Sequence, residues 1–123
     1  MNQTKKTIHN CPLCESKLNI KKLECSGCGV AFEGNFHSSP IMALQLDEQS
    51  FLELFIITGG NLREMAKMLG VTYPTLRVHL DHIIGDLKEK MKEGMEERKA
   101  VLGKKYGSKL NPEMIDQAVN NND

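Results

Sequence analysis

The chain has 123 residues, of which 40% are hydrophobic and 26% are charged, so it has room for one ordinary domain or two very small ones. Its 16 basic residues balance its 16 acidic residues, which excludes a positive field over the whole protein and strong non-specific binding to nucleic acid. It contains no run of about 18 apolar residues, so we expect no membrane-spanning helix. The first ten residues lack the apolar stretch of a secretory signal, and we expect a cytoplasmic protein.

All four cysteines lie within residues 11–36, in two closely spaced pairs. The two residues between the thiolates of a pair let one tight turn direct both sulfur atoms at one ion, and the spacer between the pairs leaves room for a hairpin. Cytoplasmic thiols stay reduced, so this spacing favours metal ligation over a disulfide or a redox pair. We predict one structural zinc ion, with iron as the alternative metal. The predicted ligands are Cys11, Cys14, Cys25 and Cys28.

Short alternating apolar stretches around the cysteine pairs predict two or three short antiparallel strands. We therefore expect a zinc ribbon over residues 9–37, followed by a connector that extends to Ala43. From Leu44 onward the apolar spacing becomes helical. We expect a helix-turn-helix domain over residues 44–87, a C-terminal helical extension over 88–119 and a disordered tail over 120–123.

Capping residues and glycines set the expected helix boundaries. A helix N-cap is a residue whose side chain accepts a hydrogen bond from the first turn, and glycine is common where a helix ends. On these signals we expect a first helix from Asp47 to Gly59, a second from Asn61 to Leu69, a third from Thr72 past Gly94 to Leu102, and a last one from Pro112.

Residues 62–77 have the spacing of a helix-turn-helix. Ala66 is small where the third helix crosses the second, and Gly70 permits the tight turn between them. Thr72 is the expected cap of the third helix, and Pro74 is tolerated in its first turn because the amide that it lacks has no partner there. Val71 is expected to fill the angle between the two helices, and the expected shared core comprises Leu69, Leu76 and Leu80.

The N-terminal end of the third helix is the end that enters the major groove in DNA-binding members of this motif. Arg77 is the main candidate for a contact with a guanine edge or a phosphate. The candidates for backbone contacts are Arg63, Lys67, Lys88, Lys90 and Lys92. Asp81 offsets the charge of Arg77, so a protein-docking role without DNA readout is the alternative. The candidate DNA-binding residues are Thr72, Tyr73, Thr75, Arg77, Val78 and His79.

Two further expectations concern partners and chemistry. An apolar stripe from Leu80 to Met95 predicts either a homodimer or packing against the C-terminal helix around Met114. The sequence has no pairing of a nucleophile with a base, no glycine-rich phosphate loop and no open metal position. We therefore expect no enzymatic activity and no small-molecule substrate.

The motifs together resemble a bacterial family named for its domain of unknown function, DUF2089. The likeness covers about residues 9–87, although Glu15 stands where we expect a glycine after the first cysteine pair. The resemblance implies a zinc ribbon joined to a helix-turn-helix in a transcriptional regulator. The helical part is also similar to region 4 of bacterial sigma factors, and RNA polymerase or a sigma factor is the alternative partner to DNA. The matching segments are Cys11–Cys14, Leu23–Gly29, Phe32–Phe36, Gly60–Glu64, Leu69–Arg77 and Leu80-Asp81.

Overall fold

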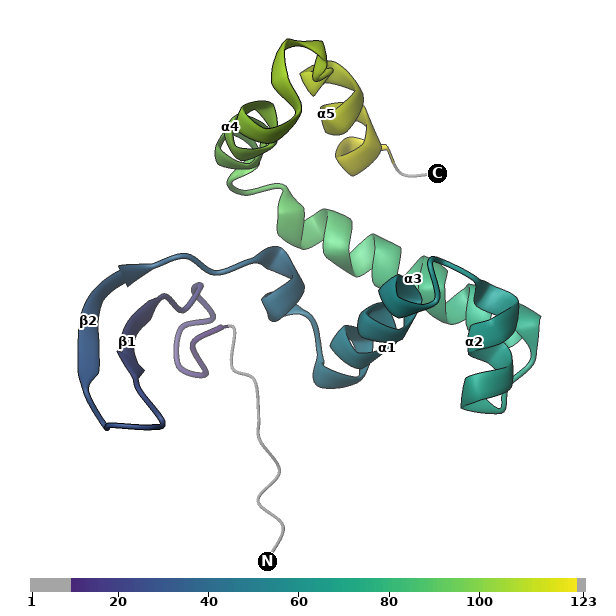
Figure 1. Ribbon diagram of the computed structural model, residues 1–123, viewed down its shortest axis with the longest axis horizontal. Helices are drawn as coiled ribbons and strands as arrows, with labels where there is room; N and C mark the ends of the chain where they lie inside the picture. Colours follow the sequence, from purple (N-terminus) through teal and green to yellow (C-terminus); the bar gives the residue numbers. More distant parts are fainter. Residues whose placement is uncertain (1–9, 122–123) are drawn as a thin grey trace, which may run out of the picture. The chain divides into compact units, whose positions relative to one another are not determined.

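The computed structural model describes residues 10–121 (Figure 1). Residues 1–9 lie outside the described residues, as do 122 and 123 of the predicted tail. The chain divides into two compact units, Met1–Gln49 and Ser50–Asp123. A strand pair in the first unit is followed by helices in the second, so the predicted two-module class is confirmed. No helix within residues 10–121 has the length and apolar character that crossing a membrane requires.

A single antiparallel hairpin forms the sheet of the first unit. Strand β1 (Ile20–Glu24) pairs with β2 (Ala31–Phe36), and Leu23 lies opposite Phe32. No side chain of either strand is buried, and Phe32 is 59% exposed. An isolated two-stranded hairpin is marginally stable in water, so the hairpin needs another source of stability.

The connector after β2 has a structure that the sequence did not indicate. A short 3-10 helix, η1, spans Pro40–Ala43, with Pro40 in its first turn and Ser39 as its N-cap. The Ser39 hydroxyl accepts a hydrogen bond from the Ile41 amide at 3.3 Å. Ser39 and Pro40 lie in the predicted connector but start a helical turn, because serine and proline both suit the first positions of a helix.

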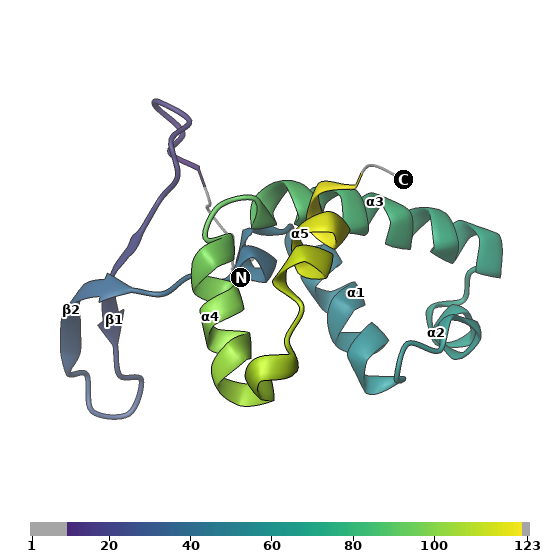
Figure 2. The ribbon, with the colours of Figure 1, turned by 90° about the horizontal axis from the view of Figure 1, so that it is seen from above.

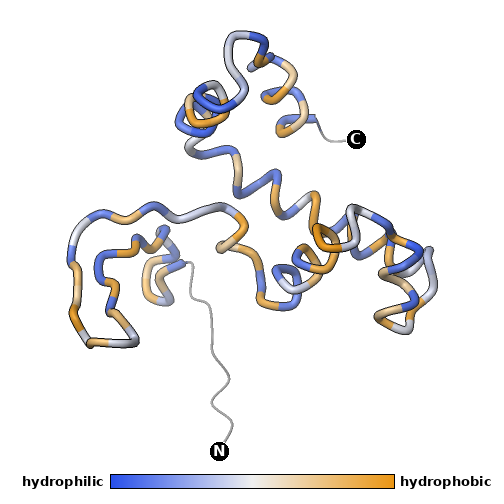
Figure 3. Tube along the Cα trace, in the orientation of Figure 1, coloured by the Kyte–Doolittle hydropathy of each residue, from blue (hydrophilic) through white to orange (hydrophobic). Residues whose placement is uncertain are grey.

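Helix α1 spans Leu46–Ile57, and hydrophobic residues make up most of its second half (Figure 3). The prediction that Asp47 caps it is wrong, because the helix begins one residue earlier and Asp47 lies in its first turn. The Glu48 carboxylate accepts from the Gln45 amide at 3.1 Å and so satisfies one of the free donors at the helix start. The helix ends before Gly59, whose φ of 66° is in the left-handed region.

Helices α2 (Leu62–Leu69) and α3 (Tyr73–Met91) form the predicted helix-turn-helix (Figure 1). Asn61 caps α2 and Thr72 caps α3, each through a side-chain oxygen that accepts from a backbone amide of the first turn. Gly70, with a φ of 69°, ends α2 and lets the chain turn into α3. The three boundary predictions at these residues are confirmed.

The core of the second unit gathers around the two crossing helices. Leu76 and Leu80 are buried as predicted, at 0% and 7% exposed. The placement of Leu69 in the core is wrong, because it is 44% exposed, and Val71, which was expected to fill the angle between the helices, is 37% exposed. Both flank Gly70, where the chain reverses direction and leaves them at the surface. The buried residues of the unit are Phe51, Met65, Ala66, Leu76, Leu80, Ile83 and Val119.

The third helix is shorter than predicted. It ends at Met91, and a new helix, α4 (Met95–Tyr106), begins after Gly94, whose φ is 74°. The Arg98 side chain of α4 donates to the backbone carbonyls of Met91 at 3.2 Å and Glu93 at 2.7 Å. These bonds satisfy carbonyls that the helix end leaves without partners, which fixes the corner between the two helices.

The last helix, α5 (Pro112–Asn120), begins at the predicted Pro112 and packs against α3 (Figure 2). It buries Val119 and extends to Asn120, one residue into the segment expected to be a tail. The Lys88 ammonium donates to the backbone carbonyl of Asn121 at 2.7 Å and fastens this end of α5 to α3. The apolar stripe of α3 therefore has an intramolecular neighbour, although Met114 itself is 64% exposed.

Candidate functional site

The first cysteine pair lies in a tight turn. The Cys11 amide donates to the Ser16 carbonyl, and the Glu15 amide donates to the Cys11 carbonyl, both at 2.8 Å. The Leu13 amide points at Cys11 Sγ at 3.4 Å. Glu15 has a φ of 65°, the left-handed conformation that glycine adopts at little cost. Glu15 therefore lies at a position whose backbone conformation favours the glycine that we expected there.

The second pair lies in the turn between β1 and β2. The Cys25 amide donates to the Val30 carbonyl at 2.8 Å, and the Gly29 amide donates to the Cys25 carbonyl at 2.9 Å. The Cys28 and Gly27 backbone amides hydrogen-bond the Cys25 sulfur and lower the pKa of its thiol. Such amides stabilise the thiolate, which is the form that binds a metal ion.

The same effect operates in the first turn, where hydrogen bonds from Ser16 and then from Cys11 lower the pKa of the Cys14 thiol. Each turn is therefore suited to metal binding by its local geometry. Within residues 10–121, no three cysteine sulfurs lie within 4.8 Å of one another. Four converging thiolates repel one another, so a cation is needed to hold them together.

The six candidate DNA-binding residues are all exposed at the N-terminal end of α3. Tyr73 is 46% exposed and Val78 66% exposed, although both carry large apolar surfaces. The Thr72 hydroxyl is already engaged, because it accepts from the Thr75 amide and donates to the Thr75 hydroxyl at 2.9 Å. The Arg77 side chain is 52% exposed.

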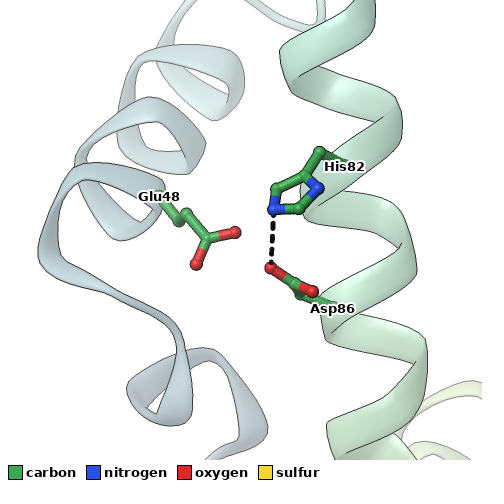
Figure 4. A group of neighbouring side chains, drawn as sticks. All are labelled: Glu48, His82 and Asp86. Atoms are coloured by element: carbon green, nitrogen blue, oxygen red, sulfur yellow. Dashed lines mark ion pairs between the residues drawn. The ribbon is translucent and has the colours of Figure 1, made fainter.

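Two pairs of oppositely charged or polar side chains, each with its members four residues apart, lie on α3. Arg77 Nη2 lies 3.2 Å from Asp81 Oδ1, and one turn later His82 Nε2 lies 3.4 Å from Asp86 Oδ2 (Figure 4). Only the first of these pairs was predicted from the sequence. The second could have been found from the same signal, because residues four apart on a helix are neighbours. Arg77 therefore has an acidic partner on its own helix, and the imidazole of His82 lies beside another carboxylate.

Comparison with protein families matches both parts of the chain. Residues 11–42 match the DUF2089 zinc ribbon, and residues 44–90 match the helix-turn-helix described as "Domain of unknown function (DUF2089)-HTH". The two segments together cover more than half of the chain, and this is the family that the sequence motifs resemble. The chain matches no curated protein and no solved structure. Helices α4 and α5 lie after the matched segments.

Proposed function

Since the chain belongs to the DUF2089 family, with a zinc ribbon ahead of a helix-turn-helix, we propose that it is a transcriptional regulator that binds DNA through α3. The observation that carries the proposal is the exposure of all six candidate residues at the capped N-terminal end of this helix. That end of the second helix of the motif is the one that reaches base edges in the major groove.

Arg77 carries the base contact in this proposal. Its guanidinium exchanges the carboxylate of Asp81 for the O6 and N7 acceptors of a guanine, which accept two parallel hydrogen bonds from an arginine. Arg63 and Lys67 lie four residues apart on α2 and are both exposed. We assign them to phosphates, because the first helix of the motif crosses the DNA backbone.

The proposal includes one structural zinc ion held by Cys11, Cys14, Cys25 and Cys28. The spacing of the pairs and the amides directed at their sulfurs support it. When bound, the ion cross-links the two turns, and its four thiolates leave no open position for a substrate. We assign no enzymatic activity to the protein.

The metal assignment is tested by loading the reduced protein with Co²⁺ and with Zn²⁺. A tetrahedral tetrathiolate spectrum and one Zn²⁺ per chain are expected. Two ions per chain would assign one ion to each pair and contradict the shared site. Iron in the freshly purified protein, measured by elemental analysis, would replace zinc as the resident metal.

The DNA assignment is tested by selecting duplexes from a randomised pool at low salt with the zinc-loaded full chain. A preferred sequence is expected, and Arg77→Ala should weaken its binding roughly 5- to 150-fold, since one good bidentate base contact provides about 1–3 kcal/mol of discrimination. Arg63→Ala is the matched control, because loss of a phosphate contact lowers affinity for every sequence alike. A pool that shows no enrichment would overturn the proposal.

Docking on RNA polymerase or a sigma factor without DNA readout is the second candidate. It is favoured by Ile56 and Ile57, which are 71% and 78% exposed in the last turn of α1. Co-sedimentation with purified polymerase, with and without sigma factor, tests it, and Ile57→Ser should weaken the complex. The homodimer stays a prediction, which light scattering at high protein concentration would contradict by showing a monomer.

A further inference from the structure

A local excess of positive charge lies in the part of the chain that follows both family-matched segments. Residues 98–112 contain no acidic residue, although the whole chain has equal numbers of acidic and basic residues. This stretch forms most of α4 and the 3-10 helix η2 (Gly107–Lys109). Its basic residues are Arg98, Lys99, Lys104, Lys105 and Lys109.

Two of these five cations have structural roles. Arg98 binds the carbonyls at the end of α3, as described above. The Lys99 ammonium lies 2.9 Å from Glu96 and 3.0 Å from Asp116, and its side chain is 12% exposed. Hydrogen bonds to these two carboxylates raise the pKa of Lys99. Lys99 therefore joins α4 to α5 and is not available to a partner.

The other three lysines, Lys104, Lys105 and Lys109, are all exposed, and we call them the basic corner. Within residues 10–121, none of the three forms an ion pair with an acidic side chain. The side chain of Tyr106 accompanies them, 64% exposed, with Lys105 Nζ 5.9 Å from the centre of its ring. The charges of the corner are therefore open to an external anion, beside an exposed phenol that can donate a hydrogen bond.

The backbone holds the three lysines in one place. Gly107, with a φ of 82°, ends α4 and turns the chain into η2. After the turn the Leu110 amide donates to the Gly107 carbonyl at 3.3 Å, and a Cβ on Gly103 would lie 3.7 Å from Leu110 Cδ2. Leu110 thus packs back onto α4, which keeps Lys109 next to the lysines of the last helical turn.

We propose that the basic corner binds the phosphate backbone of duplex DNA, as a contact separate from the N-terminal end of α3. The inference rests on the proposed function only in taking DNA as the ligand. Arg77, the arginine at the N-terminal end of α3, is paired with Asp81, so that end supplies little net attraction for phosphates. The basic corner comes after the C-terminal end of α3 in the chain, and its three lysines are unpaired within the described part of the protein. Each lysine that neutralises a phosphate releases a condensed counterion, which favours binding.

The test compares two charge-matched triple variants of the zinc-loaded full chain. The first carries Lys104→Gln, Lys105→Gln and Lys109→Gln, and the control carries Lys17→Gln, Lys21→Gln and Lys22→Gln, three exposed lysines elsewhere. Binding to a duplex is followed by fluorescence anisotropy over a range of salt concentrations. Circular dichroism checks that both variants retain their helices.

In the first variant, the plot of log affinity against log salt is expected to become less steep, with the magnitude of its slope reduced by about 2.7, since each phosphate contact contributes about 0.9. At low salt its affinity for DNA should fall roughly tenfold or more. The control is expected to change the slope by less than about one contact, 0.9. Equal losses in the two variants would attribute the effect to net charge and overturn the proposal.

Failure of this proposal and failure of the proposed function give different results. If the selected sequence depends on Arg77 but the slope is the same with and without the corner lysines, the basic corner is wrong and DNA readout by α3 stands. If no sequence is selected but the slope still falls in the first variant, the corner stands alone. Binding to anionic lipid vesicles that depends on the corner, with unchanged DNA binding, would also overturn the proposal.

Discussion

The two units of the chain hold their shapes by different means. The hairpin of the first unit has no buried side chain in either strand, whereas the helices of the second unit enclose Met65 and Leu76 at 0% exposed. The second unit can thus be stabilised by apolar burial, and the hairpin cannot. We infer that a metal ion bound at the cysteine turns would stabilise the first unit, as side-chain packing stabilises the second.

The largest effect is expected on removal of the metal, which should unfold the hairpin and leave the helices folded. A strong chelator, or the substitution Cys25→Ser, should abolish zinc binding and the ordered hairpin, because metal binding and folding are coupled in such small modules. The helices should persist. Loss of hairpin amide protection in hydrogen exchange, with unchanged helical circular dichroism, is the expected result. Simultaneous loss of both signals would mean that the second unit depends on the first.

The reverse experiment weakens the packed unit. Leu76→Ala should lower the free energy of unfolding of the helical unit by about 2–5 kcal/mol, since it leaves a cavity at a fully buried site. Thermal or urea denaturation followed by circular dichroism measures this loss, and zinc content should stay the same. Val78→Ala, at a residue 66% exposed on the same helix, is the control and should change stability by less than about 0.5 kcal/mol.

A smaller effect is expected in the first cysteine turn. Glu15→Gly should stabilise the ribbon by about 1 kcal/mol, because a left-handed backbone conformation costs a residue with a Cβ about that much. Competition with a calibrated chelator would register the gain as tighter zinc binding. Gly29→Ala is the opposite change, since it adds a Cβ at a φ of 78°, and it should weaken zinc binding. Unchanged or weaker affinity in Glu15→Gly would contradict the strain at this turn.

The smallest effect concerns the paired face of α3. Asp81→Asn should raise affinity for duplex DNA a few-fold, because it removes a negative charge near the phosphates and frees Arg77 from a surface ion pair contributing roughly 0–1 kcal/mol. Fluorescence anisotropy at low salt measures the change, and it should shrink as salt rises. Asp86→Asn is the matched control one turn further from the proposed groove contact. A decrease in affinity would show instead that Asp81 positions Arg77 for base contact.

The amino-acid sequence by itself determined the local features of this protein. The caps Asn61 and Thr72, the stop at Gly70 and the helix start at Pro112 lie where sequence reasoning placed them. Each of these depends on a few neighbouring residues, because a cap or a turn is completed by backbone groups within one helical turn. The spacing of short motifs also indicated the family.

Tertiary structure alone decided which surfaces are covered and how the helices are divided. Leu69 has the spacing of a core residue but lies half exposed beside Gly70, and the long third helix breaks at Gly94, where Arg98 binds the freed carbonyls. The basic corner likewise depends on tertiary structure, because Lys99 is paired with Asp116 of α5 whereas Lys104 and Lys105 of the same helix have no acidic partner among the described residues. Burial and pairing depend on residues distant in sequence, and a local pattern does not encode which of them will meet.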